Sequence, residues 1–448
     1  MGKARAAPLL AWPDTVAAAP VLSPPAWLGV GLVGVTAGYF LMPSAWEHRV
    51  WVLIGVVMPL IILRARAAWY LVSTSRLLVL GLVFQGWMAA SWVMNGRAPS
   101  GLEVLVTFSN MGMLMAFSCA TALVANDRRW LTRLRDVTIM AAVLAAVVSI
   151  IVYWVAGSPE NVGARLRNWF VHGGQHPVPT GIQFAWAAAF AAVAAVGAPS
   201  GRNRWLWLGA VVVLTLAICC TQTRGALLGL GIALLALAAA HRFSGRGLLP
   251  LMLALVVVFS FQFAGPAAVQ ASMSRHSGTA PLPPVGQAER LSKDPLRQLV
   301  DRRDSGRVEL YRQLLKRLQA PEKMFFGLGW WADHSCAQPD LHWKATHPHS
   351  AFLSTLYHGG QVGLILLCLV LAEAARRAWK RAIHQHSFEG LVLLALGTTT
   401  LIFDGESAVT FITEPRFEPL VLWFAVGLLA VRAANGEKKT GFQILPPS

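Results

Sequence analysis

The amino-acid sequence predicts an all-α polytopic membrane protein with about twelve transmembrane helices. Of its 448 residues, 55% are hydrophobic and only 13% are charged, whereas soluble domains carry about 25% charged residues. Glycine, proline and tryptophan are frequent, with 39, 25 and 18 residues, as is typical of lipid-spanning helices with aromatic side chains at the membrane interfaces. This composition excludes a water-soluble enzyme, a secreted disulfide scaffold and a disordered chain.

Successive apolar segments account for the twelve expected helices, because a spanning helix needs about 20 predominantly apolar residues. They lie near residues 26–43, 50–63, 77–94, 104–125, 137–156, 178–197, 205–221, 225–240, 248–264, 350–371, 387–403 and 417–433. An even number of crossings places both ends of the chain on one side. Prolines interrupt the apolar run before the first segment, so we expect no cleavable signal peptide and a first helix that acts as the targeting signal.

The positions of lysine and arginine predict the orientation. With the N-terminus inside, the inner loops and tails hold twenty basic residues and the short outer loops hold six, so both tails are expected in the cytoplasm. The predicted regions are a tail at 1–24, nine helices in 25–264, a long outer loop at 265–349, three helices in 350–433 and a tail at 434–448. Most of the net charge of +17 is then a topology signal that also binds anionic lipid headgroups, and no nucleic-acid partner is expected.

The long outer loop exceeds the usual length of a connection, and loops of this length tend to be functional or disordered. Residues 305–320 have a helical period, with Asp304 or Ser305 as the predicted cap and Pro321 as the end. The apolar stripe of this helix is Tyr311, Leu314 and Leu318. Arg307 falls on the same inward face. It therefore needs an anionic partner, either a bound anion or a carboxylate such as Asp404, Glu406 or Glu414.

Other outer segments carry residues that topology does not require. The connection C-T-Q-T-R-G (220–225) is so short that Arg224 lies at the tip of a hairpin or just inside the membrane, where an arginine usually marks a functional site. The segment 157–178 contains Arg165, Arg167, His172 and His176. The sequence T-H-P-H-S (346–350) places His349 at the entrance to the tenth helix, where it serves either as a functional group or as a helix cap.

Four arginines, namely Arg165, Arg167, Arg224 and Arg307, are thus expected on one side of the membrane together with His349. The planar guanidinium group binds phosphate through two parallel hydrogen bonds, so the arrangement suits a lipid-linked diphosphate at the outer bilayer surface. Carboxylates are nearly absent from the apolar segments. A proton- or sodium-coupled transporter normally has one near the midplane.

The order of four motifs resembles the bacterial O-antigen ligases, which share a superfamily with O-antigen polymerases and O-linked oligosaccharyltransferases. The motifs are T-R-G (223–225), S-G-R (305–307), G-L-G (327–329) and H-P-H-S (347–350). The resemblance covers the fifth to the twelfth predicted helix and the long loop. The family pattern usually reads His-x-His-Asn, and Ser350 stands at the asparagine position.

The resemblance implies a membrane-embedded glycosyltransferase of GT-C-like helical architecture. Such a ligase moves polysaccharide from undecaprenyl diphosphate to the lipid A core on the periplasmic face of the bacterial inner membrane. Arg224 and Arg307 would bind the diphosphate, with Arg165 and Arg167 as weaker candidates, and His349 would be the catalytic base of an inverting transfer. Secondary candidates are His347, His176 and Asp404.

We expect no cofactor and no metal ion, because the His and Cys spacing in residues 334–349 fits no standard zinc site and the outer loops lack grouped acids for magnesium. Two kinds of alternative stay open. A polymerase or an O-oligosaccharyltransferase would use the same donor with another acceptor. A lipid-linked glycan transporter would need cations along a path through the membrane.

Overall fold

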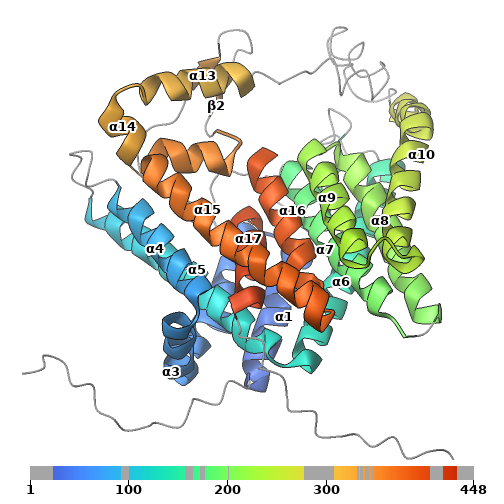
Figure 1. The fold of residues 1–448 in the computed structure, drawn as a ribbon. Helices are drawn as coiled ribbons and strands as arrows, with labels where there is room; N and C mark the ends of the chain where they lie inside the picture. The colour runs from blue at the N-terminus through green and yellow to red at the C-terminus, as the bar shows by residue number, and fades with distance from the viewer. Residues whose placement is uncertain are drawn as a thin grey trace, which may run out of the picture.

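The computed structural model describes residues 24–91, 100–156, 165–171, 177–199, 201–276, 307–329, 332, 336–338, 343–345, 348–403 and 417–430. These residues fold into a helical bundle, and helices from the long loop and one short hairpin cover one end of it (Figure 1). The first half consists of α1 (Ala26–Leu41), α2 (Ala45–Val52), η1 (Leu53–Val57), α3 (Met58–Thr74), α4 (Arg76–Ala90), α5 (Gly101–Ala125), α6 (Arg128–Ile151), η3 (Val152–Ala156), α7 (Pro177–Gly197) and α8 (Gly201–Thr221). The second half consists of α9 (Arg224–Ala240), α10 (Gly245–His276), α13 (Arg307–Arg317), α14 (Pro321–Phe326), β1 (Cys336–Gln338), β2 (Trp343–Ala345), α15 (Ala351–Gln385), α16 (Glu389–Phe403) and α17 (Phe417–Ala430).

Every apolar segment predicted from the sequence overlaps a helix of the structure. Among the described residues, six helices are long and apolar enough to cross a membrane, and shorter apolar helices of 10–17 residues accompany them. Large apolar side chains such as Ile62, Leu105 and Met140 are exposed on the outside of the bundle, as expected where helices face lipid. The chain is therefore a helical polytopic membrane protein, while the count of twelve crossings stays a prediction.

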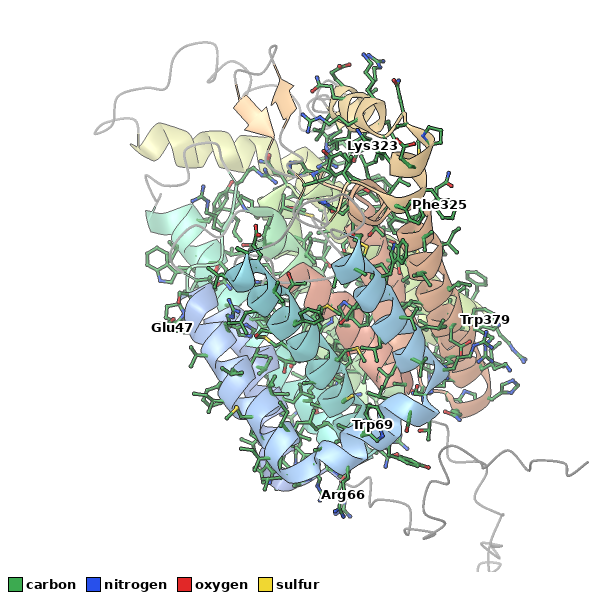
Figure 2. The ribbon with its side chains drawn as sticks, turned by 90° about the vertical axis from the view of Figure 1, so that its left-hand side faces the viewer. Glu47, Arg66, Trp69, Lys323, Phe325 and Trp379 are labelled. Carbon is green, nitrogen blue, oxygen red and sulfur yellow. The ribbon has the colours of Figure 1, made fainter. Side chains whose placement is uncertain are left out.

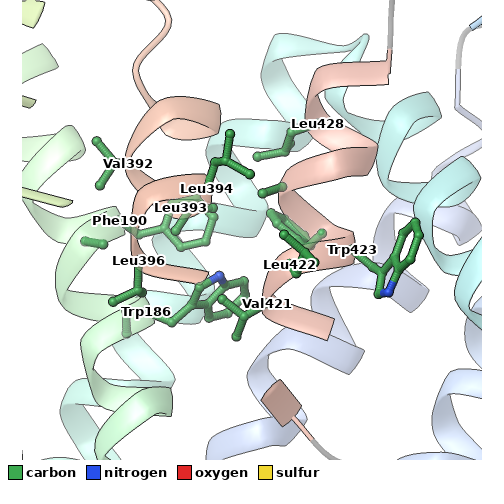
Figure 3. Packing of buried hydrophobic residues seen from close by; sticks show 14 of the residues in the cluster. Trp186, Phe190, Val392, Leu393, Leu394, Leu396, Val421, Leu422, Trp423 and Leu428 are labelled. Atoms are coloured by element: carbon green, nitrogen blue, oxygen red, sulfur yellow. The ribbon is translucent and has the colours of Figure 1, made fainter. Parts of the chain in front are cut away.

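Helix α7 is the buried centre of the bundle. Its alanine-rich sequence lets α6, α8, α9 and α16 approach closely, because small residues bring membrane helices together. The rings of Trp186 and Phe190 of α7 lie 5.3 and 5.9 Å, between centroids, from that of Phe424 of α17. Figure 3 shows Trp186 and Phe190 in this core beside the leucines and valines of α16 and α17. Edge-to-face rings of this kind fix the helices relative to one another.

The long loop contains the predicted helix, with differences at its edges. Helix α13 buries Leu314, as predicted, and also Leu310, while Tyr311 is only partly buried. Leu318, just after the helix, is fully buried in the same cluster. Pro321 does more than end a helix, because it is an opening residue of α14, where its missing N–H costs nothing.

The antiparallel hairpin β1–β2, which pairs Cys336 with Ala345, was not predicted. Strands of three residues are too short to show an alternating pattern. A further difference concerns α10, which continues to His276, beyond the predicted end at residue 264.

Two ends of the bundle serve as reference points. The α13 end carries α13 and α14 (Figure 1), and Figure 2 shows Lys323 and Phe325 there. The α3 end lies opposite, where Figure 2 shows Arg66 and Trp69. Helices α4 and α15 connect the two ends in antiparallel fashion. At the α13 end the Trp87 indole Nε1 donates to the Gly359 carbonyl (2.7 Å), and at the α3 end Arg377 Nη1 donates to Ser75 Oγ (3.4 Å).

Candidate functional site

The turn between α8 and α9 determines the position of Arg224. The Thr223 hydroxyl donates to the Pro177 carbonyl (3.1 Å) and its oxygen lies 3.0 Å from that of Thr221. Gly181 of α7 leaves room for both threonines, since a Cβ atom there would lie 2.8 Å from Thr221 Oγ1 and from the Thr223 Cβ atom. The hydrogen bond from Thr223 therefore holds the turn against the start of α7. Arg224, which is half-buried, is the first residue of α9.

Residues 165–168 form an extended segment that inserts among the ends of several helices. The Leu166 N–H donates to the Cys220 carbonyl (2.9 Å), and Asn168 Nδ2 donates to the Phe40 carbonyl (3.0 Å). Half-buried Arg165 donates from Nε to the Thr221 carbonyl (2.9 Å) and from Nη2 to the Gln222 carbonyl (3.5 Å). Arg165 thus lies against the turn that precedes Arg224.

Arg167 lies between two buried residues, Leu166 and Asn168, and its own side chain is exposed. The two arginines therefore have different surroundings: Arg165 is half-buried against the α8–α9 turn, and Arg167 faces outward.

Arg307 reaches the same end of the bundle from the long loop. Its Nη1 group donates to the carbonyl of Phe403, the last residue of α16. Helices α9 and α16 are antiparallel, because the ring of His241, just after α9, lies 4.3 Å from that of Phe388, just before α16. The carboxyl end of α16 therefore lies beside the start of α9, which places Arg307 and Arg224 at the α13 end of the bundle.

His349 immediately precedes α15. Its backbone is left-handed, with φ of 53°, and the residue is half-buried between buried Pro348 and buried Ser350. The Ser350 hydroxyl accepts a hydrogen bond from the Leu353 N–H (3.4 Å), so Ser350 rather than His349 caps the helix. The first turns of α15 pack against α13, because Leu353 and Leu356 contact the cluster that contains Leu310 and Leu314. His349, which immediately precedes α15, therefore lies at the α13 end.

A break in α15 orients the segment that follows His349. At Gly360 the backbone has φ of 65° and ψ of −166°, a conformation that is essentially restricted to glycine. The G-L-G turn holds this break in place. The N–H groups of Leu328 and Gly329 donate to the carbonyls of Tyr357 (2.8 Å) and His358 (3.0 Å), and His358 Nδ1 donates to the Gly329 carbonyl (2.8 Å).

The G-L-G motif predicted no role for this glycine turn, and no pattern in the sequence pointed to buried His358. The two adjacent glycines at 359 and 360 inside an apolar helical segment were a signal for the break, because glycine is costly in a helix interior.

Replacing Gly360 with alanine is expected to destabilise the protein by about 1–3 kcal/mol, the usual cost of a backbone conformation that a side chain disfavours. The new Cβ atom would also collide with the Phe325 carbonyl. Thermal unfolding of the purified protein measures the effect. Gly209→Ala is the matched control, since a Cβ at Gly209 of α8 meets nothing within 4 Å. A Gly360→Ala variant that unfolds at the wild-type temperature contradicts the expectation.

The resulting site is electropositive for two reasons. The first is that Arg165 and Arg307 donate to backbone carbonyls at the carboxyl ends of helices. The partial negative charge of a helix end does not neutralise the full positive charge of a guanidinium group. The amino end of α9 adds a partial positive charge beside Arg224. Because a guanidinium group has five N–H donors, contact with a carbonyl fixes its orientation while its full charge can still act on an anion.

Several sequence-predicted residues fall outside the part of the chain that the structure describes. These are His176, His347 and Asp404, with Glu406 and Glu414 as the other carboxylates considered for Arg307. The same holds for much of the His and Cys segment at 334–349 that was weighed as a zinc site.

A comparison with known protein families gave a match over part of the chain. Residues 209–368 match the family model described as O-antigen ligase, which confirms the resemblance drawn from the sequence motifs. The matched segment contains Arg224, Arg307, Gly360 and His349, whereas Arg165 lies before it. A comparison with curated proteins gave no match. The match covers less than half of the chain.

Proposed function

Since residues 209–368 belong to the O-antigen ligase family, we propose that this protein transfers a polysaccharide from undecaprenyl diphosphate to a sugar of the lipid A core. The proposal is supported by the location of Arg224, Arg307 and His349 at one end of the bundle, where Arg165 contacts the turn that precedes Arg224. Three arginines suit a diphosphate group, and a histidine suits the activation of a sugar hydroxyl.

In the proposed reaction, His349 accepts the proton of the acceptor hydroxyl as its oxygen attacks the anomeric carbon of the donor. The bond between that carbon and the diphosphate oxygen breaks, and undecaprenyl diphosphate leaves with the bonding electrons. Arg224 and Arg307 stabilise the negative charge that develops on the leaving group, with Arg165 and the exposed Arg167 as secondary contributors. A single displacement inverts the anomeric configuration.

The proposed reaction needs neither a cofactor nor a metal ion, because the leaving group is already activated and fixed cations stabilise its charge. A polymerase and an O-oligosaccharyltransferase would use the same donor site, so the acceptor distinguishes them. A glycan transporter is a weaker candidate, because Arg165, Arg224 and Arg307 gather at one end of the bundle instead of following a path through it.

Incubation of the purified protein with undecaprenyl-diphosphate glycan and rough lipopolysaccharide tests the proposal, in EDTA and without nucleotide. The expected result is a ladder of glycosylated lipopolysaccharide on a gel. Parallel reactions offer a second lipid-linked glycan or a serine-containing peptide as the acceptor. Product formed only with one of these acceptors contradicts ligation and assigns the enzyme to the polymerases or the oligosaccharyltransferases.

The proposal also requires the α13 end to face the periplasm of the inner membrane, with both tails in the cytoplasm. A cysteine introduced at Gln287, in the long loop, is expected to react with a membrane-impermeant maleimide in cells whose outer membrane alone is permeabilised. A cysteine at Thr440, in the C-terminal tail, is the control and should react only after the inner membrane is opened. The reverse pattern contradicts this orientation.

A further inference from the structure

A second concentration of positive charge lies at the α3 end, away from the candidate functional site. We call it the basic cluster; it comprises Arg76, Arg376, Arg377, Lys380 and Arg381. The contact between Arg377 Nη1 and Ser75 Oγ brings Arg76, the next residue after Ser75, beside α15. Arg76 and the basic residues of α15 therefore lie at the same end of the α4–α15 pair.

Part of the basic cluster is structural. Arg377 Nη1 donates to the carbonyls of Leu429 and Ala430 (both 3.2 Å), and Arg381 Nη1 donates to that of Leu428 (2.6 Å). These contacts cap the carboxyl end of α17, as cationic side chains commonly do. Arg377 and Arg381 therefore hold the helices together at this end.

The other members of the cluster face outward. Arg376 is bound by Glu373 through Nε and Nη2 (both 2.8 Å), yet its side chain is 50% exposed. Because Glu373 also pairs with Arg377 (2.8 Å), one carboxylate is shared by two arginines. Arg76 and Lys380 are exposed and form no ion pair among the described residues. The outward face of the cluster therefore keeps a net positive charge.

Exposed aromatic residues place this face at the level of lipid headgroups. In the sequence of α15, Trp379 falls between Arg376 and Lys380, and its side chain is 48% exposed. The side chain of Trp69 in α3 is 67% exposed. Figure 2 shows both tryptophans on the outside of the bundle, with Trp69 at the α3 end. Tryptophan is enriched at the boundary between membrane and water. Farther along α15, exposed Ile365 and Leu369 give an apolar surface suited to acyl chains.

We propose that Arg76, Arg376 and Lys380 form a binding site for the headgroup of an anionic phospholipid. Glu373 fixes the guanidinium group of Arg376, and Trp379 lies at the boundary between the headgroup and the acyl chains. A lipid phosphate would accept hydrogen bonds from Arg376 and Arg76, while Lys380 adds a point charge. This site lies at the opposite end from the O-antigen ligase residues and does not depend on the proposed reaction.

Native mass spectrometry of the purified full-length protein tests the site, with phosphatidylglycerol as the probe and phosphatidylcholine as its uncharged counterpart. Each cation near an anionic surface strengthens binding by roughly five-fold, and Arg376 is partly neutralised by Glu373. Arg376→Gln combined with Lys380→Gln is therefore expected to weaken phosphatidylglycerol binding by about ten-fold and to leave phosphatidylcholine binding unchanged. The control is Lys316→Gln with Lys323→Gln, which removes two exposed charges at the α13 end and should bind like the wild type.

Arg76→Gln alters a single exposed side chain and gives a second measurement if the double variant unfolds. It is expected to weaken phosphatidylglycerol binding by several-fold. The proposal is wrong if the wild type binds the two lipids equally, or if the variants at the α3 end bind phosphatidylglycerol as the control does.

Discussion

Replacement of His349 by alanine is expected to slow glycan transfer by about 10²- to 10⁴-fold, the usual contribution of a general base, without a matching loss of donor binding. The reason is that the proposed base contacts the incoming hydroxyl, whereas the arginines bind the diphosphate. Single-turnover transfer and equilibrium binding of undecaprenyl-diphosphate glycan, both in EDTA, measure the two effects separately. Ser350 rather than His349 accepts the capping hydrogen bond of α15, so the substitution should leave the start of the helix intact.

His347→Ala is the comparison for His349→Ala, because it removes the other imidazole of the H-P-H-S motif. It is expected to have the smaller effect on transfer. If His349→Ala binds the donor much more weakly but transfers normally at saturation, His349 belongs to the donor site and another residue is the base.

Substitution of Arg224 or Arg307 by alanine is expected to abolish measurable transfer. Each substitution removes a cation that, in the proposed reaction, stabilises the negative charge on the diphosphate leaving group. Lysine at either position should restore only part of the activity, since a point charge does not reproduce the planar hydrogen-bonding fork. The transfer assay with rough lipopolysaccharide measures both effects.

Two arginines provide matched controls for these substitutions. Arg312 lies on α13 with Arg307, but its side chain is 61% exposed and pairs with Glu309 (2.7 Å). Arg246 is exposed near the start of α10. Alanine at either control position should leave transfer unchanged. Full activity of Arg224→Ala or Arg307→Ala removes that residue from the proposed site.

The sequence was a good guide wherever a local pattern determines the structure. Long apolar segments became helices because a lipid environment requires every backbone group to bond within its own segment. The period of residues 305–320 predicted α13, and the short C-T-Q-T-R-G connection predicted a tight turn at Arg224. These are properties of neighbouring residues, so one sequence is enough to recognise them.

Contacts between distant segments could not be predicted in this way. The Arg165 contact with the Thr221 carbonyl joins residues that are separated by a whole helix and more. The break at Gly360 depends on a turn some thirty residues earlier, and no periodic pattern records that pairing. The same applies to Leu310, whose burial depends on the exact rotation of α13 against Tyr357.

The contacts of Arg165 and Arg307 with helix carboxyl ends have a consequence for turnover. These guanidinium groups have a weak counter-charge, namely the carbonyls at the ends of α8 and α16. A diphosphate that attracts them must compete with those carbonyls, which lowers its net affinity. When undecaprenyl diphosphate departs, the helix ends are ready to accept the same hydrogen bonds again. In the proposed reaction, the two helix ends would thereby favour product release and limit product inhibition, which an enzyme with a lipid product confined to the membrane needs in order to begin another cycle.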